Sequence, residues 1–221
     1  MDALTQELIN CIETTNLAQR PDLLDQAQKA FLDYLGAMTA AFGKEGVRAL
    51  ERFLDLSKAS DKALYYGFAS HYLDYDDAQA NLQGHFSTVI YSALLAILNE
   101  EDSWADFLEA YVVGAELEGI FGYLINPSYR LQGWHPTATV GPMGAAAAIG
   151  KLRGLRGEDL ASLLSLAATQ SSGLALQSGS DGKPLHAGLA ARNALWAYEL
   201  LRNTTLKAAL NPFDPQEGWF K

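Results

Sequence analysis

Hydrophobic residues recur at helical spacing through most of this 221-residue chain. In residues 3–16, for example, Leu4, Leu8, Ile9 and Ile12 fall on one face of a helix. The same spacing predicts further helices at residues 21–43, 46–56, 61–76, 87–99, 103–123, 141–153, 157–172 and 184–203. No alternating run of β-branched residues is long enough to predict a strand. We therefore expect an all-α fold, a compact multi-helix bundle.

Several of these predicted helices contain glycine in their interior, for example Gly114, Gly144 and Gly150. Each interior glycine costs a helix about 1 kcal/mol relative to alanine. We expect close approach between neighbouring helices to offset that cost.

The pattern predicts one all-helical domain over residues 1–203, followed by a different segment at residues 204–221. This last segment loses helical periodicity, contains Pro212 and Pro215, and carries Trp219 and Phe220 almost at its end. Large aromatic residues near a terminus imply packing, against this domain, a partner chain or a further domain. We expect the segment to lead toward a second domain that this chain does not include.

Composition sets limits on the partners. Hydrophobic residues make up 49% and charged residues 19% of the chain, which is enough for a sizeable core. The net charge of -10, from 26 acidic and 16 basic residues, argues against nucleic acid or an anionic membrane surface as a partner. A small anion still fits, because a local pocket can be positive. With no signal-peptide pattern and no apolar run of transmembrane length, we expect a cytoplasmic protein.

Familiar catalytic and metal-binding motifs do not occur. The four histidines are not spaced as ligand pairs on one helix, and none lies near a cysteine, so we predict no metal site. There is no phosphate-binding glycine loop and no Gly-x-Ser-x-Gly motif. The single cysteine, Cys11, cannot form an internal disulfide, and we expect it to be packed in the core.

Three junctions between a loop and a helix each carry a basic or titratable side chain. His85 precedes a helix for which Ser87 is a natural N-cap, and His135 precedes a helix that begins near Pro142. Lys183 and His186 lie where the helix at residues 184–203 begins. Helix starts offer unpaired N–H groups and attract anions. A lone histidine at such a position is more often structural, so the hypothesis of a carboxylate-binding site depends on convergence of the three junctions.

An acidic cluster, Asp74, Asp76 and Asp77, comes shortly before His85. Two interpretations stay open. The cluster is either a solvated helix end, or it turns one carboxylate toward the pocket, where that group orients a histidine or acts as a base.

Together these stretches resemble the MmgE/PrpD family of 2-methylcitrate dehydratases, which also includes cis-aconitate decarboxylase and iminodisuccinate epimerase. The similar stretches cover most of the chain and occur in the family's order: residues 31–43, 69–89, 110–122, 133–155 and 168–197. The most specific are GWHPTAT at residues 133–139 and GKPLHAG at residues 182–188.

The resemblance implies an all-helical first domain of a cofactor-independent enzyme that acts on small di- and tricarboxylates. By motif, Asp74, His85, His135 and Lys183 match the family's active-site positions. His186 shares the motif of Lys183, and we expect it to bind substrate together with His135 and Lys183. Family members continue into a second, mixed α/β domain that supplies further catalytic residues.

Two positions depart from the family pattern, and both lose a polar group. Ala78 stands where a threonine is frequent, and Ile120 where an arginine is common. Three hypotheses remain: a lyase unit that pairs with a separately encoded second domain, a non-catalytic scaffold that binds carboxylates or dimerises, and a self-sufficient lyase. A face left uncovered by the second domain would expose apolar residues, so we also expect a homodimer.

Overall fold

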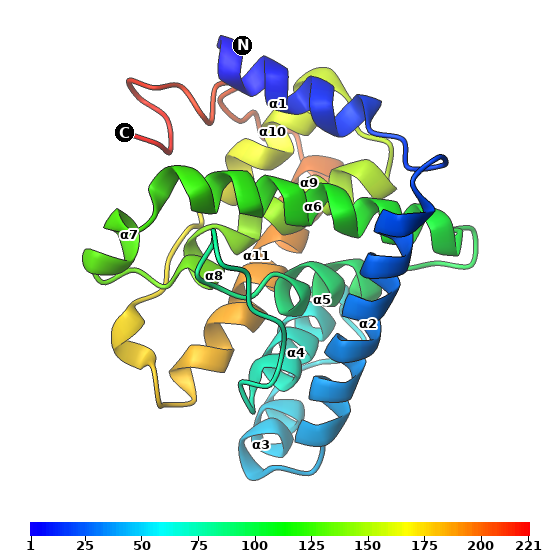
Figure 1. Cartoon of the computed structure of the whole chain (residues 1–221), viewed down its shortest axis with the longest axis vertical. Helices are drawn as coiled ribbons and strands as arrows, with labels where there is room; N and C mark the ends of the chain where they lie inside the picture. The colour runs from blue at the N-terminus through cyan, green and yellow to red at the C-terminus, as the bar shows by residue number, and fades with distance from the viewer.

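The computed structural model describes the whole chain, residues 1–221, and is built of eleven α-helices (Figure 1). These are α1 (Ala3–Thr14), α2 (Pro21–Ala41), α3 (Glu45–Phe53), α4 (Ala59–His71), α5 (Ser87–Ile97), α6 (Trp104–Ile125), α7 (Ser128–Leu131), α8 (Pro136–Thr139), α9 (Gly141–Leu152), α10 (Gly157–Ala168) and α11 (Gly182–Asn203). A single 3₁₀ turn, η1, spans Ala175–Gln177. Apart from two isolated bridges there is no β-structure, so the all-α prediction is confirmed.

The predicted helices are present, and most of their ends lie within a few residues of the expected ones. The largest error is at residues 61–76, because α4 ends at His71 and residues 72–86 form a loop. Asp74 in this loop has a φ of 57°, which a right-handed helix cannot contain. The helices α7 and α8 were not predicted, since four residues are too few to show a period.

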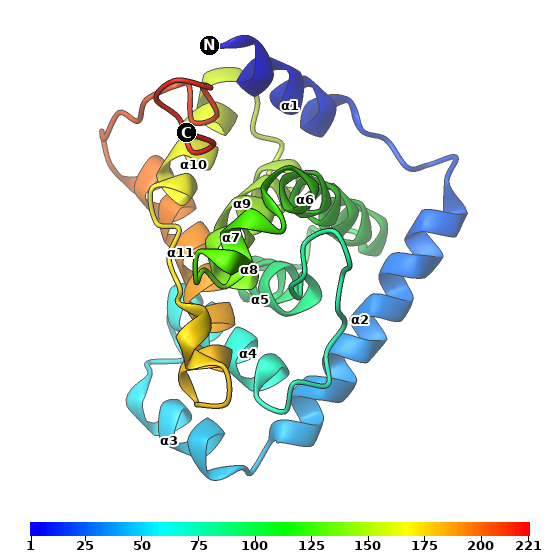
Figure 2. The ribbon, with the colours of Figure 1, turned by 60° about the vertical axis from the view of Figure 1, so that its left-hand side comes forward.

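Five helices, α4, α5, α6, α9 and α11, contribute most of the core. Figure 2 shows α5, α6 and α9 in the middle of the molecule, with α2 along one edge and α11 along the other. The most enclosed helix is α9, in which every residue from Gly141 to Gly150 is buried. Its run of four alanines lets α5, α6, α10 and α11 all pack against it.

The expected close approach between helices occurs at two glycine pairs. On α4 and α11, Gly67 faces Gly188, and a Cβ added to Gly67 would lie 2.8 Å from the Cα of Gly188. A Cβ on Gly188 would overlap the carbonyl oxygen of Leu64. On α6 and α9, a Cβ on Gly114 would lie 2.6 Å from the carbonyl oxygen of Gly144. At both crossings the two backbones are in contact, which explains the glycines in the helix interiors.

The contact between α6 and α9 encloses a carboxyl group. The side chain of Glu118 is fully buried, and neither of its oxygens has a hydrogen-bond partner. The backbone of α9 covers it so closely that a Cβ on Gly144 would overlap the carboxyl. Burial, followed by the negative charge of Asp77, raises the pKa of Glu118 well above its usual value. The folded protein therefore favours the neutral, protonated form of this side chain.

The C-terminal segment packs on the helical domain itself, which is one of the three alternatives that its aromatic residues left open. Phe213 is fully buried, and its ring centroid lies 4.9 Å from that of Phe121 on α6. Phe220 also packs edge-on against Phe121. The indole Nε1 of Trp219 donates a hydrogen bond of 2.9 Å to Ser171 Oγ.

The expectations about Cys11 and about membrane-spanning segments can also be compared with the structure. Cys11 is exposed on the outer side of α1, so the prediction that it packs in the core is wrong. None of the helices combines the length and the apolar character that a membrane span requires.

The glycine contact between α4 and α11 makes a first prediction. Gly188→Ala should lower the free energy of unfolding by about 3 kcal/mol, the upper part of the range for overpacked cores, because the added methyl meets backbone that cannot rotate away. The control is Gly36→Ala on the exposed side of α2, where nothing lies within 4 Å of the new methyl. That variant should gain about 0.5–1 kcal/mol. Urea unfolding measures both, and equal stability of the two variants would contradict the backbone contact.

Glu118 makes a second prediction, about pH. Its pKa is raised in the folded state, so the folded protein holds a proton that the unfolded chain releases above its ordinary pKa of 4.5. The stability from this proton is complete below pH 4.5 and is lost as the pH rises toward the folded-state pKa. Burial also raises the pKa of Asp77, to about 6, so its own contribution ends about one pH unit above that value. Between pH 7 and 8, the unfolding free energy should therefore fall in the native chain and stay flatter in Glu118→Gln. Glu116→Gln, which removes an exposed carboxyl of the same helix, should keep the native slope.

Candidate active site

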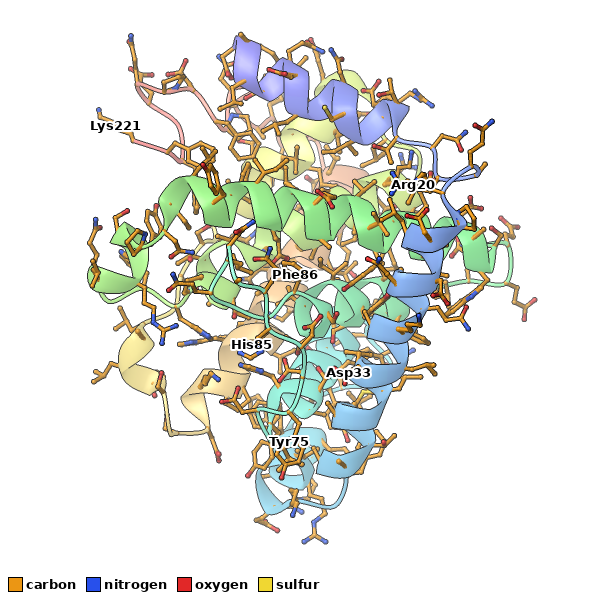
Figure 3. All side chains as sticks on the ribbon, in the orientation of Figure 1. Arg20, Asp33, Tyr75, His85, Phe86 and Lys221 are labelled. Carbon is orange, nitrogen blue, oxygen red and sulfur yellow. The ribbon has the colours of Figure 1, made fainter.

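The three helix-start junctions converge on one cavity. Its volume is about 310 Å³, and Asp74, His85, His135 and Lys183 all line it. Figure 3 shows His85 on the side of its loop that faces the start of α11, whereas Tyr75 of the same loop lies farther out. The structure therefore brings together all four residues that the motifs selected, from three separate parts of the chain: the loop before α5, the start of α8 and the start of α11.

Lys183 and Asp74 form an ion pair at this cavity. The ammonium group of Lys183 contacts Asp74 Oδ1, and the side chain of Lys183 is only 17% exposed. Burial acts to raise the pKa of Asp74, but the hydrogen bond and charge of Lys183, with smaller effects of His71 and His85, lower it overall. Asp74 reaches the lysine from a left-handed backbone conformation, and such strained residues are frequent at functional sites.

His85 is held in one orientation by its loop. Its Nδ1 lies 2.6 Å from the carbonyl oxygen of Asp77, which can only accept a hydrogen bond, so Nδ1 carries the proton. The other ring nitrogen, Nε2, lies 3.6 Å from Asp74 Oδ1. Burial lowers the pKa of His85, the carboxylate of Asp76 opposes this, and the charges of His71 and Lys183 lower it further. The ring is therefore neutral at pH 7, with Nε2 available as a base.

Behind His85 lies a buried pair that the sequence did not predict, His71 and Asp76. The Nδ1 atom of His71 lies 2.9 Å from each carboxylate oxygen of Asp76, and both side chains are fully buried. Asp76 Oδ2 also lies 3.4 Å from Nδ1 of His85. The interpretation of the acidic cluster as a solvated helix end is therefore wrong for Asp76, whose carboxyl group is buried against the two rings.

His135 lies against the same group of rings. Burial, followed by the charges of His71, His186, Lys183 and His85, lowers the pKa of His135 to about 3, so this ring stays neutral at ordinary pH. Its Nδ1 lies 3.2 Å from Nδ1 of His186. The ring centroids of His71 and His135 are 6.2 Å apart, so all four histidines of the chain belong to one cluster.

His186 does not line the cavity. It lies behind His135 and contacts it through the shared Nδ1 pair. Direct binding of substrate by His186, which the resemblance suggested, stays a prediction, and the geometry favours an effect through His135.

The helix starts also differ in detail from the prediction. Ser87 is the first residue of α5 and not its N-cap, because its hydroxyl donates to the carboxylate of Asp77 instead of capping the helix. Tyr111 on α6 lies 2.8 Å from the same hydroxyl and completes a chain of hydrogen bonds to Asp77. Burial, partly offset by Ser87, raises the pKa of Asp77 to about 6. This chain fixes the loop whose carbonyl holds His85.

The junction at His135 contains two helices where one was expected. The four-residue α8 begins directly after His135, and α9 begins at Gly141, with Pro142 in its first turn as predicted. The N–H groups nearest to His135 therefore belong to the short helix α8.

The cavity wall also includes residues that the motifs did not identify, notably Arg130 and Gln83. Arg130 lies on α7, and Gln83 adopts a left-handed φ of 52° in the loop before His85. No sequence period marks either residue. The departures from the family pattern lie outside this cavity: Ala78 lines an adjoining one, and Ile120 lies in a groove between α2 and α6.

A metal ion would find several oxygen and nitrogen atoms here, but each of these side chains already has a partner, although Nε2 of His71 has none. His71, Asp74, Asp76 and His85 offer atoms within 4.8 Å of one another. Asp74 is paired with the Lys183 ammonium, Asp76 with His71, and His85 Nδ1 with a carbonyl. The positive charge of Lys183 opposes a second cation, so the arrangement suits an anion better than a metal ion.

Comparison with known proteins supports the family resemblance that the motifs indicated. Residues 55–221 match the MmgE/PrpD N-terminal domain. Human cis-aconitate decarboxylase is 28% identical over 141 residues, which is 61% of this chain and 29% of the human protein. The cis-aconitate decarboxylase of Aspergillus terreus is 34% identical over 128 residues, 54% of this chain and 26% of that protein. A cis-aconitate decarboxylase-like protein, oryM of Aspergillus oryzae, is 33% identical over 141 residues, 59% of this chain and 29% of its own length.

The matched stretch thus spans less than a third of each of these relatives. The match to the family's N-terminal domain, residues 55–221, includes the complete cluster of histidines, Asp74, Asp76 and Lys183. Because the match to the family's N-terminal domain covers most of the sequence and all the residues gathered at this cavity, the chain belongs to the MmgE/PrpD family.

Proposed function

We propose that this chain is the helical part of a lyase that acts on a small di- or tricarboxylate, such as 2-methylcitrate, by elimination next to a carboxylate. The observation that carries this proposal is the cavity itself, which is lined by the largely buried Lys183 and by two neutral histidines, His85 and His135. We propose further that turnover needs a second family domain from a separate chain and no cofactor.

The first step in this proposal is binding of a substrate carboxylate to Lys183. The ammonium group already holds one carboxylate, that of Asp74, so its position and partner chemistry suit the exchange. A carboxylate bound there is next to Nε2 of His85, since that atom lies near Asp74. Removing a proton from the neighbouring carbon leaves negative charge on that carboxylate, which the lysine stabilises.

His85 is the proposed base. Its Nδ1 proton is fixed on the Asp77 carbonyl with the Asp76 carboxylate close by, and both interactions stabilise the imidazolium that forms when Nε2 takes the substrate proton. His135 is the proposed hydrogen-bond donor to the leaving hydroxyl, which departs as water with the proton that His85 took from the carbon. His135 is neutral, and if His186 donates to its Nδ1, its Nε2 carries a proton. A neutral imidazole of this kind donates hydrogen bonds effectively where charge develops.

The second candidate function is a carboxylate-binding protein without turnover. Ala78 and Ile120 favour it, because both positions lose a polar group that is frequent in the family. Both functions share the same ligand chemistry. They differ in whether a bound carboxylate is converted, which a lyase assay with and without a second-domain chain decides.

The catalytic assignment predicts the effect of two substitutions. In an assembly that turns over substrate, Lys183→Ala and His135→Ala should each reduce kcat/KM by at least about 100-fold, because each removes a charge or donor at the reacting carbon. Lys207→Ala, which removes an exposed lysine with no ion pair, should leave kcat/KM unchanged. Measurement is by absorbance of the unsaturated product. Near-normal activity of both site variants would refute these roles.

We also propose a homodimer. Three large hydrophobic side chains on the outer face of α6 are exposed: Ile120 at 47%, Tyr123 at 73% and Leu124 at 55%. Together with Leu23 and Ala30 of α2 they line a groove of about 580 Å³. A contiguous apolar surface of this kind is typical of an interface.

One chain has a mass of 24.0 kDa, and light scattering should therefore give twice that value. Ile120→Asp should shift the protein toward the monomer, because it places a charge in the apolar contact. A native chain that is monomeric at every concentration tested would contradict the dimer.

A further inference from the structure

One guanidinium group at the cavity has no partner in the molecule. Arg130 makes no ion pair and no side-chain hydrogen bond, whereas Arg153 is neutralised by Asp102 and Lys151 by Glu109. It lines the site cavity and also an adjoining cavity of about 430 Å³. Gln83, His85 and Arg130 line both, so Arg130 lies on the wall that the two cavities share.

The backbone around Arg130 is fixed to the loop at residues 72–86, which carries His85. At the end of α6, the Asn126 side-chain amide donates to the carbonyl oxygens of Asn81 and Leu82, at 2.8 and 2.6 Å. After α7, the N–H of Gly133 donates to the carbonyl oxygen of Arg130 at 3.1 Å. The loop that presents His85 and the turn that presents Arg130 are therefore held as one wall.

The charges at the cavity are distributed unevenly. Lys183 is already balanced by Asp74, so a substrate carboxylate that replaces Asp74 leaves the positive charge of Arg130 uncompensated. In a chain of net charge -10, an isolated cation at a cavity favours a ligand with more than one negative group. A guanidinium suits a carboxylate in particular, since its planar N–H groups match the two oxygens.

We propose that Arg130 binds a second carboxylate of the substrate while Lys183 binds the first, and that Arg130 thereby selects polycarboxylates over monocarboxylates. This inference rests on the proposed function of the cavity. Arg130 acts on specificity and does not move a proton. The reacting carbon lies between the two cations, next to His85 and His135, which both line the same cavity.

The test compares two ligands and three substitutions in the full chain. The ligands are tricarballylate, with three carboxylates, and butyrate, with one. The variants are Arg130→Gln, Arg130→Lys and the control Arg202→Gln, which removes an exposed arginine that also lacks an ion pair. Ring signals of the four histidines report binding by NMR titration up to millimolar Kd.

Arg130→Gln should raise the Kd of tricarballylate by about 10–100-fold, the range for a lost hydrogen bond between charged groups, and leave that of butyrate within about twofold. Arg130→Lys should recover part of the affinity, because it keeps the charge but loses the paired N–H groups. Arg202→Gln should change neither value. Unchanged thermal midpoints would show that all three variants fold.

Different failures have different meanings. If Arg130→Gln weakens both ligands equally, or no more than Arg202→Gln does, the second-carboxylate contact is overturned. Loss of tricarballylate binding in Lys183→Ala would in that case leave the proposed function intact. If the native chain binds neither ligand, both this inference and the proposed function fail.

Discussion

The contact between α4 and α11 is the constraint on which the site depends. Gly67 and Gly188 let the two helices touch backbone to backbone, and only glycine at both positions permits that distance. The last residue of α4 is His71, and the first turn of α11 carries Lys183. A wider spacing at the crossing would move these two groups apart, and with them the partners Asp76 and Asp74. Packing in the core thus determines the distances between charges at the surface.

The charges of the cluster are arranged in two layers. The buried layer is the pair of Asp76 and His71, which has no access to solvent. The outer layer is the pair of Asp74 and Lys183, which meets the cavity. Between them lie His85 and His135, whose pKa values are lowered mainly by burial and by the positive charges on either side. An isolated buried carboxylate would be costly, so the pairing with His71 is what allows Asp76 to lie buried beside His85.

Much of the fold could be predicted from periodicity, because long amphipathic helices such as α2 and α11 have a clear period and strong start signals. The convergence of His85, His135 and Lys183 followed from their shared position before helices and from family motifs, not from spacing. The pair of His71 and Asp76 could not be predicted once residues 61–76 were assigned to one helix. In a continuous helix, residues five apart point about 140° away from each other. Only the turn after His71 brings them into contact.

The place of Arg130 at the cavity and the burial of Glu118 could not be predicted for a different reason. Arg130 lies in a four-residue helix, where no period exists, and its place at the cavity results from the hydrogen bonds of Asn126 to a loop more than forty residues earlier. Glu118 lies in a helix that is otherwise apolar at its buried positions, and its burial depends on which face Gly144 of α9 covers. Both are properties of contacts between distant segments, which composition and local pattern do not encode.

The ion pair of Asp74 and Lys183 also explains how the ammonium group of Lys183 is stabilised at a partly buried cavity when no ligand is bound. A free ammonium there would be poorly solvated, and a second positive charge, Arg130, lines the same wall. Asp74 neutralises the lysine in the absence of ligand, and its exposed side chain can turn away without leaving a buried charge unpaired. In the proposed binding step, a substrate carboxylate replaces this anion with another, so the net charge around Lys183 changes little.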